Sequence, residues 1–149
     1  MPPNVASDRP TIVLVENDGE LRGRLAAGLR HDGMRVVEYD DGGPALAAIE
    51  QGLSADVLVI APQADGMATG DVARQARVLA PRIQIVVTPA SEATDGLPRD
   101  AHMLIKPFEP SRLSRYIRFV AARPALRGAL RAVYRQARSA PPPSAPVAN

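Results

Sequence analysis

The chain has 149 residues, a length typical of one domain, and such a domain buries about two thirds of the surface that its unfolded chain exposes. Hydrophobic residues make up 46% of it, yet only 3% is aromatic and Trp is absent, so the core must be built from Ala, Val, Leu and Ile. The absence of Cys excludes disulfides and thiolate sites, and no apolar run approaches the roughly 18 residues of a membrane span, so we expect a cytoplasmic protein without a transmembrane segment.

Charge is distributed unevenly along the chain. Residues 1–109 hold all 16 acidic residues and 10 Lys or Arg, a formal charge of −6, whereas residues 110–149 hold eight Arg and no acid, a formal charge of +8. The net charge of +2 hides this asymmetry. A basic terminal segment of this kind indicates a surface that meets something acidic.

The chain begins with a predicted leader, a strand and a helix. Residues 1–10 carry three Pro and predict a loose leader, and the apolar residues 11–15 predict a buried strand. Asp18 can cap the helix that follows, which we expect to end at Gly33. Three apolar residues of this helix keep the spacing of one buried face: Leu21, Leu25 and Leu29.

The third predicted strand is the stretch around which the chain is organised. Before it, residues 34–39 predict a second strand, residues 41–43 a turn and residues 44–51 a short helix. Residues 56–61 then form an apolar run rich in β-branched types, which is typical of a strand covered on both faces in a parallel sheet. Ligands of such sheets bind beyond the carboxyl ends of the strands, where Ala61 offers no reactive group.

The second half continues the alternation of strands and helices. A helix is predicted over residues 70–79 and a strand over residues 83–87, but residues 89–100 lack an apolar stripe, so no long helix is expected there. A short strand over residues 102–105 and a helix over residues 111–122 follow. The expected buried faces are Val72, Ala76 and Leu79 on the first helix and Leu113, Ile117 and Val120 on the second. This alternation predicts a doubly wound α/β fold.

Motifs at the strand ends resemble the receiver domain of two-component response regulators (CheY-like). They are Glu16-Asn17-Asp18 after the first strand, Gly66-Met67 after the third, Thr88 at the end of the fourth and Lys106-Pro107-Phe108 after the fifth. The resemblance covers roughly residues 10–122, and we expect a receiver-like domain over residues 10–123. It implies a flavodoxin-like, five-stranded parallel sheet of order 2-1-3-4-5, here with a degenerate fourth helix and a basic helix added at the C-terminus.

The resemblance is to a receiver whose phosphorylation site is degenerate. In the family, an Asp at the end of the third strand takes a phosphoryl group from a histidine kinase, with Mg²⁺ held between it and acids after the first strand. The matching residue is Ala61, and the acid pair is reduced to Glu16 and Asn17. We therefore expect no cofactor, with Mg²⁺ binding weak or lost. Asp65 lies in a loop and is not expected to substitute.

Other family positions are retained or altered. Thr88 matches a residue that contacts the phosphoryl group, although a β-branched residue at a strand end explains it as well, and we favour this structural interpretation. Lys106 is expected to pair with Glu16, and the Lys106-Pro107 bond to be cis, as the resemblance implies. Met103 stands where the family has a rotating aromatic residue, and lacks the ring of that switch.

The C-terminal segment has its own pattern. Residues 124–138 predict a basic amphipathic helix with an apolar strip of Leu126, Leu130 and Val133. The candidate partner-binding residues are Arg127, Arg131, Arg135 and Arg138. Docking on the receiver-like domain and binding to a partner remain equally open for this helix. Residues 139–149, with four Pro, are expected to be disordered.

The leading interpretation is an atypical single-domain response regulator that acts as a phosphorylation-independent interaction module in signal transduction. Its partner would be a signalling protein such as a histidine kinase or another regulator, with an acidic surface for the C-terminal helix. One alternative is a nucleic-acid-binding regulator that uses the Arg-rich helix, which the acidic body and the lack of a helix-turn-helix disfavour. Another is a small-molecule sensor that uses the space near Glu16 and Lys106. An enzyme is disfavoured because no nucleophile, metal cluster or Gly-rich phosphate loop is recognisable.

Overall fold

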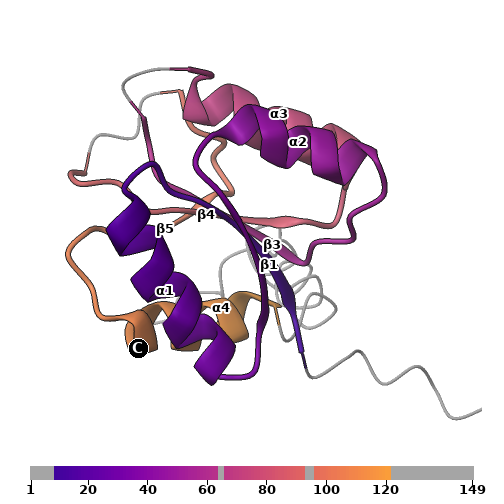
Figure 1. Ribbon diagram of the computed structural model, residues 1–149. Coiled ribbons are helices and arrows are strands. Elements are labelled where there is room, and N and C mark those ends of the chain that lie inside the picture. Colours follow the sequence, from indigo (N-terminus) through magenta and orange to yellow (C-terminus); the bar gives the residue numbers. More distant parts are fainter. Residues whose placement is uncertain (1–8, 64–65, 93–95, 122–149) are drawn as a thin grey trace, which may run out of the picture.

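A five-stranded parallel sheet organises the part of the chain that the computed structural model describes, which is residues 9–63, 66–92 and 96–121 (Figure 1). The strands lie in the order β2-β1-β3-β4-β5, which confirms the expected order. Their bounds are β1 Thr11–Val15, β2 Arg35–Tyr39, β3 Val57–Ile60, β4 Gln84–Val87 and β5 His102–Met103. The helices are α1 Gly19–His31, α2 Gly42–Glu50, α3 Thr69–Leu79 and α4 Pro110–Ala121.

The helices cover the sheet on both faces, as the apolar character of the strands requires. Helices α1 and α4 lie on one face and α2 and α3 on the other (Figure 1). Side chains alternate between the faces, so that Leu14 of β1 packs in the core below α1 and α4 while its neighbour Val15 packs in the core below α2 and α3. Within the described residues, no helix has the length and apolarity that crossing a bilayer requires.

Aspartate side chains cap the first turns of α1 and α2. The cap of α2 makes the predicted turn at residues 41–43 wrong. The carboxylate of Asp18 accepts a hydrogen bond from the Leu21 amide and caps α1, as predicted. Helix α2 begins at Gly42, inside the expected turn at residues 41–43, because the side chain of Asp41 accepts from the amide of Gly43 and so caps an earlier start. The sequence did not predict this start because Gly42 and Gly43 are typical of a turn.

Two further expectations need correction. Leu79 was expected on the buried face of α3, but it is 40% exposed, and Ala73 lies in the core beside Val72 and Ala76. The buried face of α3 is therefore built from small residues, which lets α2 and α3 pack closely. Strand β5 has two residues rather than four, although the backbone amide of Leu104 still donates to the carbonyl of Val87.

A loop replaces a helix between β4 and β5 in the described residues of this connection, as the sequence predicts. Two arginines of α3 hold it: Arg74 donates to the carbonyl of Gly96 at 3.2 Å, and Arg77 forms an ion pair with Asp100. Gly70 lies directly against the Gly96 carbonyl, where a Cβ atom would clash. The loop thus packs on the start of α3 through contacts with the backbone.

Two glycines of α1 offer a test of the packing between α1 and α4. A Cβ atom at Gly28 would lie 2.5 Å from Cβ of Pro110, in a ring that cannot rotate away, whereas a Cβ atom at Gly23 would meet nothing within 4 Å. Gly28→Ala is expected to lower the free energy of unfolding by about 1 to 3 kcal/mol through overpacking. Gly23→Ala, the matched control, is expected to raise it by about 0.5 to 1 kcal/mol because Ala favours a helix.

Urea denaturation followed by circular dichroism measures both effects. Equal stabilisation by the two substitutions would show that α1 and α4 do not approach as closely as the structure has them.

Candidate functional site

Four of the residues singled out from the sequence meet at the carboxyl edge of the sheet. Hydrogen bonds continue the strand ladders past their ends, from the amide of Glu16 to the Tyr39 carbonyl and from the amide of Ala61 to the Val15 carbonyl, each at 3.0 Å. Thr88 and Lys106 continue β4 and the β5 connection in the same way, through the carbonyls of Ile60 and Pro89. Parallel pairing therefore brings Glu16, Ala61, Thr88 and Lys106 to one edge.

An ion pair between Glu16 and Lys106 lies at the centre of this edge. The Lys106 ammonium (Nζ) is 2.8 Å from Oε2 of Glu16, across a sequence separation of 90 residues. Only 6% of the Glu16 side chain is exposed, against 26% for Lys106. The other carboxylate oxygen, Oε1, accepts a hydrogen bond from the backbone amide of Asp18 at 3.2 Å. The predicted pairing is confirmed, and so is the cis bond between Lys106 and Pro107.

The remaining predicted site residues differ in burial. Ala61 and Thr88 are each 2% exposed, so both are part of the interior at the strand ends. Asn17 is exposed, and Met103 is half-buried on β5, where it packs against the core below α2 and α3. Asp65 and the four candidate Arg residues of the C-terminal segment lie outside the described residues, so their predictions stay predictions.

Arg22 belongs to this edge and was not singled out from the sequence. Its Nη1 donates to the backbone carbonyl of Glu16 at 2.8 Å, and its Nε lies 3.7 Å from Oε1 of Glu38 on β2. Arg30 approaches the other oxygen of Glu38 at 3.1 Å. The available signal was the position of Arg22 in the first turn of α1, one turn after the Asp18 cap. A guanidinium there faces the end of β1.

The loop after β3 is held to the loop after β2. The side-chain amide of Gln63 donates to the carbonyl of Asp40 at 2.7 Å. Gly66 follows with φ of +90°, a left-handed conformation that favours glycine, and a Cβ atom there would lie 3.3 Å from Oδ1 of Asp41. In the described part of the chain, no group of three or more His, Cys, Asp or Glu side chains is placed to hold a metal ion.

Comparisons with known proteins support the fold through structure alone. No family model matches the chain, and no curated protein matches its sequence. The solved structure of a response regulator receiver protein from Sinorhizobium medicae WSM419 is similar, with a TM-score of 0.71 and 22% identity over 78% of this chain and 97% of that one. A CheY-like response regulator receiver domain protein from Methanospirillum hungatei JF-1 is similar with a TM-score of 0.68 and 19% identity, over 74% of this chain and 91% of that chain.

The receiver domain of the hybrid histidine kinase CckA is also similar, with a TM-score of 0.64 and 23% identity over 74% of this chain and 98% of that chain. Each of these structures is covered almost completely by the match, so the described part of this chain has the receiver fold, with a loop in place of a helix in the described residues between β4 and β5. The expected fold class is thereby confirmed.

The ion pair can be tested by a double-mutant cycle on the full-length protein. Lys106→Met is expected to lower the free energy of unfolding by about 1 to 3 kcal/mol, because it leaves the buried Glu16 carboxylate without its counter-charge. The cost is limited because the Lys106 side chain is 26% exposed, so water screens the pair in part. Glu16→Gln with Lys106→Met should cost less than the two single changes added together.

Asp71→Ala, which breaks a surface pair with Arg74 whose side chains are 52% and 58% exposed, is the matched control and should change stability by about 0.5 kcal/mol or less. Additive single changes at Glu16 and Lys106 would show that the two side chains do not interact.

Proposed function

We propose that this chain is a receiver-like signalling module of two-component type that binds its partner without being switched by aspartyl phosphorylation. The observation that carries the proposal is the closed ion pair of Glu16 and Lys106 beside Ala61 at the end of β3. A phosphoryl acceptor at the end of a central strand needs a nucleophilic oxygen, and the side chain of Ala61 is a methyl group. The receiver fold supports the signalling class.

The residues at this edge do not fit a Mg²⁺ ion. Mg²⁺ prefers octahedral oxygen ligands and is held in proteins by one or two carboxylates together with water and phosphate. One oxygen of Glu16 accepts from the Lys106 ammonium and the other from the Asp18 amide, so the one buried carboxylate is already engaged by two donors. An incoming cation would have to displace the ammonium and would be repelled by it.

The same ion pair supports a binding surface that stays in one state. Lys106 is held at both its backbone amide, which donates to the Pro89 carbonyl, and its ammonium. Met103 has no ring to move between two positions, and the α3 arginines hold the loop between β4 and β5. Of the family positions that respond to the phosphoryl group, Thr88 is retained at the end of β4, but the rotating aromatic residue is replaced by Met103.

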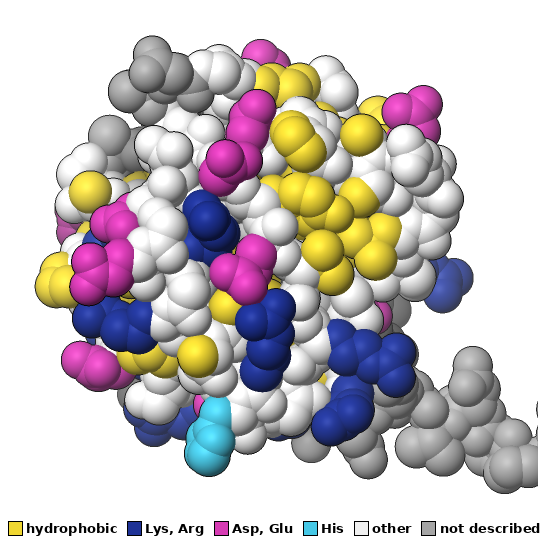
Figure 2. All heavy atoms as spheres, viewed as in Figure 1, with side chains coloured by type: hydrophobic (Ala, Val, Ile, Leu, Met, Phe, Trp, Pro, Cys, Tyr) yellow, Lys and Arg dark blue, Asp and Glu magenta, His cyan; other side chains and the backbone are white. Residues whose placement is uncertain are grey.

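Helix α4 carries the surface that we assign to the partner. Arg112, Arg115 and Phe119 are exposed and follow the spacing of one helix face, with Phe119 72% exposed. Figure 2 shows Lys and Arg side chains interspersed with Asp and Glu on the side of α1, while hydrophobic side chains gather toward α2. An exposed aromatic residue flanked by arginines is the composition of an interaction hot spot for an acidic partner, such as a histidine kinase or another regulator.

Exposure to a small phosphodonor tests the phosphorylation half of the proposal. Wild-type protein incubated with acetyl phosphate and Mg²⁺ should show no hydroxylamine-sensitive mass increase, since Ala61 has no oxygen to accept the group. Ala61→Asp alone is expected to remain unlabelled because Asn17 leaves the acid cluster short. Ala61→Asp with Asn17→Asp restores both carboxylates and should gain label, which makes it the positive control. An acyl phosphate on the wild-type chain would overturn the proposal.

Affinity capture with the full-length protein tests the binding half. A partner retained by wild-type protein should be retained equally with EDTA or with Mg²⁺ and acetyl phosphate. Arg115→Glu and Phe119→Ala should each weaken its binding about tenfold or more, since a hot-spot residue contributes on the order of 2 kcal/mol. Val78→Ala, at an apolar position that is 81% exposed on α3, is the control and should leave binding unchanged. Binding that requires the phosphodonor would contradict this function.

A further inference from the structure

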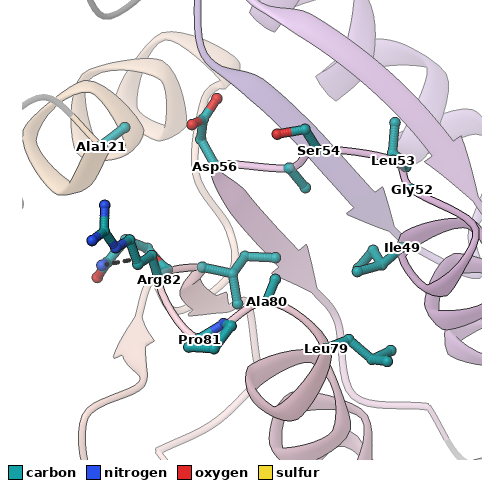
Figure 3. Close-up of a pocket in the computed structure, with 13 residues that line it drawn as sticks. Ile49, Gly52, Leu53, Ser54, Asp56, Leu79, Ala80, Pro81, Arg82 and Ala121 are labelled. Atoms are coloured by element: carbon teal, nitrogen blue, oxygen red, sulfur yellow. Dashed lines mark hydrogen bonds between the residues drawn. The ribbon is translucent and has the colours of Figure 1, made fainter.

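An open groove lies at the amino edge of the sheet, opposite to the edge that carries the ion pair. It has a volume of about 1030 Å³ and runs between the segment that leads into β3 and the segment that connects α3 to β4 (Figure 3). Ile49, Leu53 and Leu79 supply apolar side chains to its walls. Leu79 is 40% exposed, so the groove presents apolar surface that the described part of the chain does not cover.

The end of the described chain lies at this groove. Ala121, the last residue of α4, is one of the lining residues, on the side of Asp56 in Figure 3. Residues 122–149 continue from this point. The apolar strip of the following segment begins at Leu126, and five residues of extended chain span up to about 16 Å. The segment therefore starts within reach of the groove.

The segment and the groove match in their chemistry. Leu126, Leu130 and Val133 recur at helical spacing, and this strip needs an apolar surface to cover it. The groove offers such a surface together with the carboxylate of Asp56, which is exposed beside Ala121. The groove also contains one cation, Arg82. Residues 125–138 hold four Arg and no acid, so the formal charge of −6 on residues 1–109 attracts this segment to the body of the chain.

Covalent linkage strengthens this match. A ligand joined to its site by a short linker experiences an effective concentration on the order of millimolar, so even weak apolar contacts keep it bound for most of the time. A partner protein free in solution would have to exceed that concentration to compete with equal affinity. The groove at the end of α4 is thus best suited to the segment that follows α4.

We propose that residues 125–138 of the same chain dock in this groove, with Leu126, Leu130 and Val133 against Leu53 and Leu79. The docked segment covers the amino edge of the sheet and leaves its arginines on the outside. This goes beyond the function proposed above and does not depend on it, since it concerns the opposite edge of the sheet and no phosphoryl chemistry.

Disulfide trapping tests the docking directly, because the natural chain contains no Cys. Ser54→Cys, at an exposed groove residue, is combined with Leu130→Cys in the full-length protein and oxidised at low protein concentration. The expected product is a disulfide within one monomer, identified by mass spectrometry. Val78→Cys with Leu130→Cys is the control and should form it at least about tenfold more slowly. A disulfide between two chains would assign the groove to a second copy and overturn the proposal, as would equal rates for the two pairs.

Hydrogen exchange supplies a readout that does not depend on cysteines. Amides of residues 52–56 and 79–84 should exchange about tenfold faster in Leu126→Asp/Leu130→Asp than in the wild type, because opening of the groove is then no longer opposed by the docked strip. Leu79→Glu should have the same effect on residues 52–56, and Val78→Glu, its exposed neighbour, should have none. Unchanged exchange in both leucine variants would show that the segment does not occupy the groove.

Discussion

The ion pair between Lys106 and Glu16 is the interaction on which the functional edge of this molecule depends. Glu16 is 4% exposed, and a carboxylate at that depth is stable only when donors satisfy it. Its two donors come from opposite ends of the chain, the Asp18 amide from the start of α1 and the ammonium from the connection after β5. The pair therefore links the end of β1, an interior strand, to the connection after the edge strand β5, and the Arg22 guanidinium donates to the backbone carbonyl of Glu16.

The proposed function rests on the residues that stand at this edge. In a parallel sheet the carboxyl edge is where oxygen ligands and nucleophiles gather, and in this chain the central position is a buried methyl group. The positive charge of Lys106 is satisfied by protein rather than by an incoming anion. Under the proposed function, this edge recruits neither a phosphoryl group nor a divalent cation, and recognition falls to the exposed faces of the helices.

The sequence predicted the three inner strands β1, β3 and β4 well because each is an apolar run buried on both faces of the sheet, whereas the edge strands β2 and β5 contain polar residues and are less buried. The ion pair could be predicted only through the resemblance to receiver domains, since no periodicity connects residues 90 positions apart. The early start of α2 was missed because glycines normally indicate a turn, and the cap at Asp41 outweighed that tendency. Leu79 was misplaced because helical spacing alone does not tell how far along α3 the neighbouring helix extends.

The carboxyl edge of the sheet carries paired charged groups, whereas the amino edge carries partly exposed apolar side chains, and α4 extends from one edge to the other. At the carboxyl edge, Lys106 is paired with Glu16, and Arg22 donates to the backbone carbonyl of Glu16. At the amino edge, backbone loops leave apolar side chains uncovered, because the connections into β3 and β4 are short and contain small residues and Pro81. Helix α4 connects the two edges. Its first turn follows the Lys106 connection, and its last residue, Ala121, lines the groove. A segment attached to the end of α4 therefore starts beside a groove where Leu79 is left partly exposed by the described part of the chain, and covering that apolar surface would be favourable.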